Sequence, residues 1–186
     1  MAERTPLTPR ERERVRRNRA IGLSIAATIL FLDQLTKWAV THVFQLQLRR
    51  EVDLLPFFTL RWVENRGVSM GLLPAGSETT RWLLVALTAG IATFVAAWMW
   101  REKRRDDAFA LSLVLGGALG NIIDRIRFGY VVDFADLHFG EFRPFLIFNV
   151  GDAAISIAVV VLLLRAFLVR KDGAEDADPE EKIEHA

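Results

Sequence analysis

The amino-acid sequence predicts a membrane all-α fold: a four-helix transmembrane bundle with a small extracytoplasmic β-sheet in the first outer loop. Three observations predict it. Four apolar blocks are long enough to cross a bilayer, the charged residues gather between and beyond these blocks, and the first long link alternates like a strand. The clearest block, residues 82–100, contains no charged residue, and roughly 18 such residues cross about 30 Å of hydrocarbon.

The predicted spans are residues 20–43, 82–100, 108–123 and 145–169. The first follows an arginine-rich segment and resembles a secretory signal. However, Asp33, Gln34 and Lys37 stand where a cleavage site of small residues would be expected, so we expect this span to be retained. In the third span, Gly116 and Gly120 are spaced for close packing against a neighbouring helix.

The distribution of Lys and Arg predicts the orientation of the spans. Seven arginines lie in residues 1–19, and four basic residues lie in the short link 101–107. Because basic residues concentrate on the cytoplasmic side, both termini are predicted to be cytoplasmic and loops 41–81 and 125–144 to lie outside. The chain then divides into a basic cytoplasmic tail (1–19), a membrane domain (20–169) and an acidic cytoplasmic tail (170–186) that we expect to be disordered.

The first outer loop contains a predicted strand at residues 57–63. Apolar and polar side chains alternate there, so that Phe58, Leu60 and Trp62 share one face. The tripeptide 65–67, Asn-Arg-Gly, is typical of a turn. We therefore expect a small sheet on the outer membrane surface, with its apolar face on lipid or on the helices.

Three acids are predicted to lie at a similar depth in the outer half of the bundle. At 1.5 Å per residue, Asp33, Asp124 and Asp152 lie roughly 20, 24 and 26 Å from the cytoplasmic ends of their spans. Asn121 and Asn149 each precede an acid by three residues, which places each amide and acid on one helix face. Such pairs are either hydrogen-bonded staples between helices or part of a functional site, and ionisable groups at this depth favour a site.

A fourth acid, Asp133, lies among apolar residues just after the third span. If the segment folds back on the bundle, desolvation should raise the pKa of its carboxyl. Asp124 precedes Arg125 directly and is expected to stay ionised and paired with it. Because two acids that share one proton need a site without a strong cation, we prefer Asp133 with Asp152 as the chemical pair. Asp124, with Asn121 and Arg125, would form a supporting layer, although depth alone would serve Asp124 as well.

Other chemistries find little support in the composition. The chain has no cysteine, which excludes a thiolate nucleophile and a cysteine-based metal site. Its three histidines lack ligand spacing, so we expect no metal and no cofactor. The serines have no histidine or lysine in an arrangement typical of nucleophilic catalysis. A net charge of +1 gives no reason to expect a nucleic-acid partner.

Five motifs in this order resemble the lipoprotein signal peptidases (signal peptidase II) of bacteria. They are Asp-Gln-Leu-Thr-Lys at 33–37, Glu-Asn-Arg-Gly at 64–67, Gly-Gly-Ala-Leu-Gly-Asn-Ile-Ile-Asp-Arg at 116–125, Val-Val-Asp-Phe at 131–134 and Phe-Asn-Val-Gly-Asp at 148–152. The resemblance implies an aspartic endopeptidase of the inner membrane, with its site at the outer side, that cuts prolipoproteins just before a diacylglyceryl-modified cysteine. It implies a lipidated prolipoprotein as substrate and membrane lipid as surroundings, and we expect a monomer.

The resemblance also implies roles for individual residues. The catalytic pair would be Asp133 and Asp152. The remaining motif positions would bind substrate or support the site: Asp33, Lys37, Asn65, Gly67, Asn121, Asp124, Arg125 and Asn149. Two departures concern the shape of the pocket: residues 68–70 are Val-Ser-Met where the family commonly has Ala-Ala-Phe, and Gly151 stands where alanine is usual.

Two other classes of protein remain as alternatives. A small proton-coupled carrier would use buried acids and amides as a pathway, but it predicts polar residues through the whole depth of the bundle. The second span has no ionisable residue and the predicted inner halves are apolar, which favours a site at one face. An assembly scaffold explains neither the acids nor their shared depth.

Overall fold

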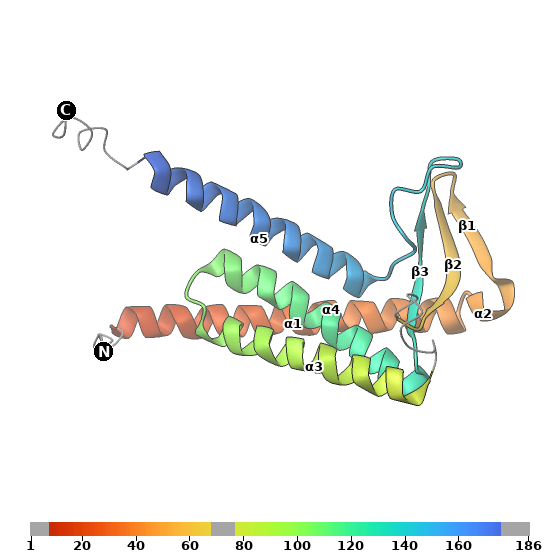
Figure 1. The fold of residues 1–186 in the computed structure, drawn as a ribbon, viewed down its shortest axis with the longest axis horizontal. Coiled ribbons are helices and arrows are strands. Elements are labelled where there is room, and N and C mark those ends of the chain that lie inside the picture. Colours follow the sequence, from red (N-terminus) through yellow and green to blue (C-terminus); the bar gives the residue numbers. More distant parts are fainter. Residues whose placement is uncertain (1–7, 68–76, 176–186) are drawn as a thin grey trace, which may run out of the picture.

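The structure is a computed structural model that describes residues 8–67 and 77–175, with side chains as far as Leu168. Four of its helices are long and apolar enough to cross a membrane (Figure 1). They are α1 (Pro9–His42), α3 (Glu78–Arg101), α4 (Arg105–Phe128) and α5 (Val150–Glu175), and a short helix, α2 (Leu46–Arg49), follows α1. With the three-stranded sheet described below, this arrangement confirms the predicted fold class.

Helices α1 and α5 have ends that differ from those predicted. Helix α1 begins at Pro9 rather than at residue 20, because Thr8 and Glu11 form a capping box and proline occupies the first turn. Most of the segment predicted as a basic tail is therefore a continuation of the first helix. Helix α5 begins at Val150 rather than at residue 145 and runs to Glu175, beyond the predicted end at residue 169. Residues 176–186, the rest of the predicted acidic tail, lie outside the described part of the chain.

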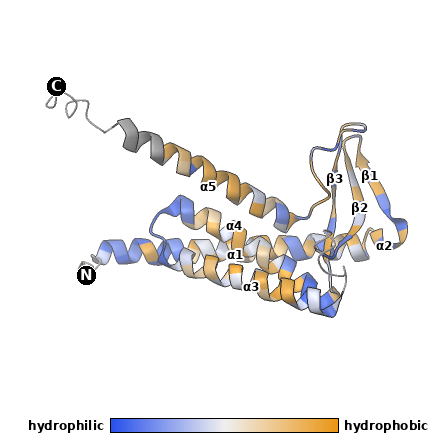
Figure 2. Cartoon of the chain, viewed as in Figure 1, coloured by the Kyte–Doolittle hydropathy of each residue, from blue (hydrophilic) through white to orange (hydrophobic). Residues whose placement is uncertain are grey.

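Helix α4 is the centre of the bundle, in contact with α1, α3 and α5. Small residues allow this close packing. A Cβ atom at Gly116 would lie 2.6 Å from the carbonyl oxygen of Ala26, and one at Gly120 would collide with the carboxylate of Asp33. The predicted role of these two glycines in close packing is thus confirmed. The outward faces of the helices are largely apolar, which suits contact with lipid (Figure 2).

The sheet lies across one end of the bundle, where α1 and α4 end and α5 begins (Figure 1). Its antiparallel strands are β1 (Glu51–Leu55), β2 (Phe58–Asn65) and β3 (Val131–Leu137), in that order. Strand β2 confirms the strand predicted at residues 57–63, and its apolar residues pack with Val40 of α1 and Phe134 of β3. Strand β3 lies in the predicted loop 125–144 and was not itself predicted.

Two isolated bridges close the link between β3 and α5. Ala135 pairs with Phe148, just before α5 begins, and Phe139 pairs with Phe142 near the tip of the link. The backbone amides of Phe134 and Ala135 both donate to the carbonyl oxygen of Phe148, at 3.1 and 2.8 Å. The start of α5 is therefore fixed against β3.

Candidate active site

A buried lysine joins α1 to α4 at the end of the bundle that faces the sheet. Lys37 Nζ lies 2.8 Å from Asp33 Oδ2 and 2.8 Å from Asp124 Oδ2, and it donates to Asn121 Oδ1 at 2.9 Å. Lys37 is 4% exposed, Asp33 0% and Asp124 1%. Buried charges are tolerated when they are paired and hydrogen-bonded, as these are. The face shared by Asn121 and Asp124 is thus confirmed.

The expected pairing of Asp124 with Arg125 was wrong, because Lys37 is the cation that Asp124 contacts. Adjacent residues of an α-helix point about 100° apart, so Arg125 leaves the helix on another side. Arg125 Nη1 reaches only the backbone oxygen of Asn121, at 3.5 Å, and its buried Nε has no hydrogen-bond partner among the described residues.

Asp33 extends the lysine cluster to α5. Its Oδ1 accepts from the backbone amide of Gly151 at 2.9 Å, and the absence of a side chain at Gly120 leaves room for its carboxylate. Gln34 donates to Asp124 Oδ1 at 3.0 Å and to the carbonyl oxygen of Gly120 at 3.3 Å. Sequence reasoning gave Gln34 no role, although it stands beside Asp33 in the first motif.

Asp152 lies in the first turn of α5, and Asn149 caps that helix. The Asp152 backbone amide donates to Asn149 Oδ1 at 2.9 Å, and the Asn149 amide donates back to Asp152 Oδ2 at 3.3 Å. The prediction that both residues share a face inside a helix was wrong: their spacing forms a capping box instead. A carboxylate at this position lies at the positive end of the helix dipole.

Asp133 lies on β3, opposite Val63 of β2, and is 2% exposed. Asn149 Nδ2 donates to Asp133 Oδ1 at 2.7 Å, and Asn65 Nδ2 donates to Oδ2 at 3.0 Å. Burial, and then the negative charge of Asp152, raise the pKa of Asp133 to about 6, although the two amides act in the opposite direction. The raised pKa predicted from its apolar neighbours is thus confirmed.

Two asparagines connect the acids. Asn121 Nδ2 donates to Asp152 Oδ1 at 2.9 Å, and Asn149 Nδ2 donates to Asn121 Oδ1 at 3.1 Å as well as to Asp133. The two acids are therefore the ends of one amide chain. Lys37 touches the middle of this chain through Asn121 Oδ1, which fixes the orientation of that amide.

Asn65 is held in the turn predicted at residues 65–67. Its Oδ1 accepts from the backbone amide of Gly67 at 3.0 Å, which leaves Nδ2 free to reach Asp133. Gly67 has a φ of +73°, a conformation that side chains other than glycine rarely adopt. The departure at residues 68–70 lies outside the described residues.

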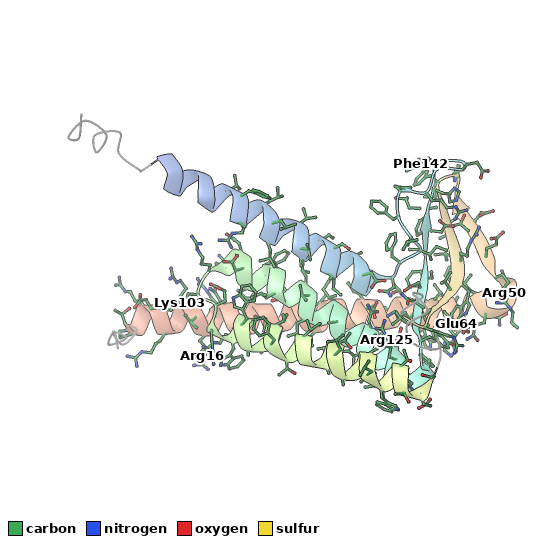
Figure 3. The ribbon with its side chains drawn as sticks, viewed as in Figure 1. Arg16, Arg50, Glu64, Lys103, Arg125 and Phe142 are labelled. Carbon is green, nitrogen blue, oxygen red and sulfur yellow. The ribbon has the colours of Figure 1, made fainter. Side chains whose placement is uncertain are left out.

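A cleft of about 910 Å³ opens beside Asp133, between the end of β2, strand β3 and the segment before α5. Its polar side includes Asn65, Asp133 and the ion pair between Asp136 and Arg143. Its apolar rim is the run 144–147, in which Leu146 is 91% exposed. Glu64 also lines this cleft. Figure 3 shows that it lies at the same end of the bundle as Arg125. A cleft with a few convergent polar groups suits an extended ligand.

The chain matches the sequence profile described as signal peptidase (SPase) II over residues 25–168. It belongs to the signal peptidase II family. The lipoprotein signal peptidase of Rhizorhabdus wittichii is 56% identical over 163 residues, 87% of this chain and 95% of that protein. The lipoprotein signal peptidase of Sphingopyxis alaskensis is 54% identical over 159 residues, which are 85% of this chain and 92% of that protein.

A solved bacterial membrane enzyme, determined in meso at 1.9 Å, has a similar fold. Its TM-score is 0.68 at 26% identity, over 79% of this chain and 92% of that one. The chain is thus a membrane-embedded protein of the signal peptidase II family, and these comparisons give the carrier alternative no support. All ten site residues singled out from the sequence lie inside the matched segment. Among the hydrogen bonds and ion pairs of the described residues, Arg125 joins the other nine only through the backbone oxygen of Asn121.

The lysine cluster makes a prediction about stability. Lys37→Met keeps the length of the side chain but leaves Asp33 and Asp124 buried without their cation, so the free energy of unfolding should fall by about 3–5 kcal/mol. Thermal unfolding of the purified protein in detergent measures this change. Lys103→Met, at an exposed position, is the matched control and should change stability by less than about 0.5 kcal/mol. Equal melting temperatures for the two variants would contradict the central role of Lys37.

Proposed function

We propose that Asp133 and Asp152 are the catalytic pair of this signal peptidase II, a membrane aspartic endopeptidase. Its reaction is the removal of the signal peptide from diacylglyceryl-modified prolipoproteins, by a cut just before the lipidated cysteine. One observation carries the assignment of the pair: two acids from different elements, β3 and α5, are joined by Asn149 and Asn121 at the edge of a cleft.

The surroundings of the two acids support a division of labour between them. The raised pKa of Asp133 favours its protonated form, which suits it to be the acid of the pair. Asp152 accepts from the Asn149 backbone amide and from Asn121 Nδ2, which orients its carboxyl group to act as the base. A pair in these roles can begin hydrolysis at once. Asp152 takes a proton from a water molecule, the water oxygen bonds to the scissile carbonyl carbon, and Asp133 gives its proton to the carbonyl oxygen.

The second half of the reaction restores the starting protonation states of both acids. The Asp133 carboxylate takes a proton from a hydroxyl of the tetrahedral intermediate, Asp152 donates its proton to the leaving nitrogen, and the carbon–nitrogen bond breaks. Asn121 and Asn149 hold the two carboxyl groups in place without adding a charge. Asp33, Lys37 and Asp124 form a supporting layer. Asn65 and Gly67 line the cleft, and they, with Arg125 on α4, would position or bind the substrate.

The cleft suggests where the substrate binds. Its polar side can receive the peptide around the scissile bond, and the exposed apolar run 144–147 can contact the acyl chains of the lipidated cysteine. Binding energy gained from those chains would position the bond between the acids. Every side chain of the network comes from one chain, as the proposed monomer requires. The near-zero net charge gives no support to a nucleic-acid partner.

The location follows from the same arrangement. We infer that the chain lies in the bacterial inner membrane with both termini in the cytoplasm and the site at the outer, periplasmic side. The seven arginines before residue 20 and the four basic residues of link 101–107 support this orientation, and both lie at the end of the bundle opposite the acids.

Conservative variants can distinguish the roles of the three acids. Asp133→Asn and Asp152→Asn keep the size of each side chain but remove its proton transfer, so turnover should fall by at least about 10²- to 10⁴-fold. Asp124→Asn should lower stability while measurable turnover remains, because it removes a partner of Lys37 rather than a reacting group. The three variants are compared at equal folded amounts on one lipidated precursor. Near-normal turnover of Asp133→Asn beside an inactive Asp124→Asn would make Asp124 the second acid.

The raised pKa of Asp133 predicts a pH dependence. Since the protonated form is the one required, kcat/KM should fall as pH rises through about 6. Asn65→Ala removes a hydrogen bond that lowers this pKa, so its alkaline limb should move to higher pH. Profiles of kcat/KM against pH for the unmodified protein and for Asn65→Ala measure both effects, and the shift of the alkaline limb between them is the decisive comparison. A limb that does not move would show that Asp133 is not the acid being titrated.

Orientation is tested by reporter fusions. Fusions after Lys103 should report the cytoplasm, and fusions before Glu78 should report the outside, because the basic residues of link 101–107 oppose translocation. A cytoplasmic position before Glu78 would put the acids on the wrong side of the membrane and overturn the proposed location.

A further inference from the structure

A second polar site lies at the end of the bundle remote from the acids. A cavity of about 230 Å³ separates α1 from the first turn of α4 there. Figure 3 labels Lys103 in the link that precedes α4, at the opposite end of the bundle from Arg125. The cavity is lined by Asn18, Ile21, Gly22, Ile25, Arg105, Asp106, Ala108 and Phe109. None of these residues belongs to the site described above.

The cavity contains a hydrogen-bond acceptor that the described residues do not satisfy. Asn18 is 3% exposed, and its Nδ2 donates to the carbonyl oxygen of Lys103 at 3.2 Å. Because a carbonyl oxygen can only accept, this bond fixes the orientation of the amide. Asn18 Oδ1 is then left buried with no partner in residues 8–67 and 77–175. An unsatisfied buried acceptor costs about 1–3 kcal/mol, so the site is suited to a donor from outside the chain.

Charges of both signs stand beside this acceptor. Arg105 opens α4, and its N-cap residue, Arg104, makes no side-chain capping bond, so the first turn of α4 offers amide donors as well as a guanidinium. Asp106 also lines the cavity, and its carboxylate is only loosely paired, 3.7 Å from Arg165. Arg165 contacts Asp107 more closely. The cavity thus combines a guanidinium and the first turn of a helix with a carboxylate and the Asn18 amide oxygen, which is unpaired among the described residues.

Apolar residues continue from the polar site toward the middle of the bundle. Ile21 and Ile25 follow Asn18 along α1, and Phe109 follows Arg105 along α4. A second hollow of about 530 Å³ shares Asp106 and Phe109 and extends along α5 past Val161, Leu164 and Leu168. One polar site with two apolar grooves leading away from it matches the shape of a lipid with two acyl chains.

We propose that this cavity binds the headgroup of a phospholipid that carries a phosphate and a primary ammonium group, as phosphatidylethanolamine does. The lipid belongs to the leaflet remote from the acids. Its phosphate lies at Arg105 and the first turn of α4, and its ammonium group donates to Asn18 Oδ1 and approaches Asp106. Its acyl chains follow the two grooves, past Ile25 and past Leu164.

The acceptor distinguishes this headgroup from others. A choline headgroup has the same phosphate and positive charge but no N–H, so it cannot satisfy Asn18 Oδ1. A glycerol headgroup donates hydroxyls but brings no positive charge to Asp106. A free phosphate would use Arg105 and leave the apolar grooves empty.

The headgroup series is the main test and needs no variant. Dissociation constants are measured by native mass spectrometry on the full, delipidated chain in detergent, with dioleoyl phosphatidylethanolamine, phosphatidylcholine and phosphatidylglycerol, and with inorganic phosphate. Hydrogen bonds to charged groups predict at least about fivefold tighter binding of the ethanolamine lipid than of the choline lipid. Equal binding of these two overturns the proposal, as does tighter binding of the glycerol lipid or of phosphate alone.

Variants locate the site. Asn18→Leu should remove the preference for ethanolamine over choline, whereas Arg105→Gln should weaken both lipids about equally. Lys103→Gln removes a charge from the same link without lining the cavity and should leave all constants unchanged. Prolipoprotein cleavage in detergent should be unchanged in all three variants, which also shows that they are folded. A preference that survives in Asn18→Leu, or a loss in Lys103→Gln equal to that in Arg105→Gln, places the lipid elsewhere.

Discussion

The buried ammonium group of Lys37 is the interaction on which the rest of the site depends. It lies between two carboxylates that have almost no access to solvent, and a charge buried there without a partner would be strongly destabilising. Each carboxylate also accepts a hydrogen bond from the backbone of another element, Asp33 through Oδ1 and Asp124 through Oδ2. Asp33 binds the backbone of α5 at Gly151, and Asp124 accepts from the backbone of β3 at Val132, at 3.1 Å. One positive charge thus positions both elements that carry Asp133 and Asp152.

Between this cluster and the acids the connection is made by amides rather than by charges. Asn149 has three tasks at once: it caps α5, contacts Asn121 and donates to Asp133. A neutral amide can donate and accept, so it orients two carboxyl groups without neutralising either. A lysine in its place would put a positive charge beside Asp133 and favour its ionised form, against the raised pKa that this carboxyl has. The neutral layer of Asn121 and Asn149 thus separates the charge of Lys37 from Asp133 and Asp152.

Much of this arrangement could be predicted because a membrane restricts what a sequence can form. The spans, the strand at β2 and the shared end of the acids all follow from apolar runs, alternation and helical rise. The pairing of β3 with β2 could not be predicted in this way, since it joins two loops that are distant in sequence. Nor could the start of α5: the i, i+3 spacing of Asn149 and Asp152 fits a helix interior and a capping box equally well, and only the tertiary contact of Phe148 with β3 decides between them.

The two bridges in the link between β3 and α5 make the distance between Asp133 and Asp152 independent of the length of that link. Ala135 and Phe148 are hydrogen-bonded across the base of the link. This bridge, rather than the chain around the tip at Gly140, therefore fixes the position of Asp152 relative to Asp133. The tip can therefore lengthen, shorten or change composition among related enzymes while the acids keep their geometry. The tip residues 139–142 do not line the cleft beside Asp133, so variation there would leave both the two acids and the cleft unchanged.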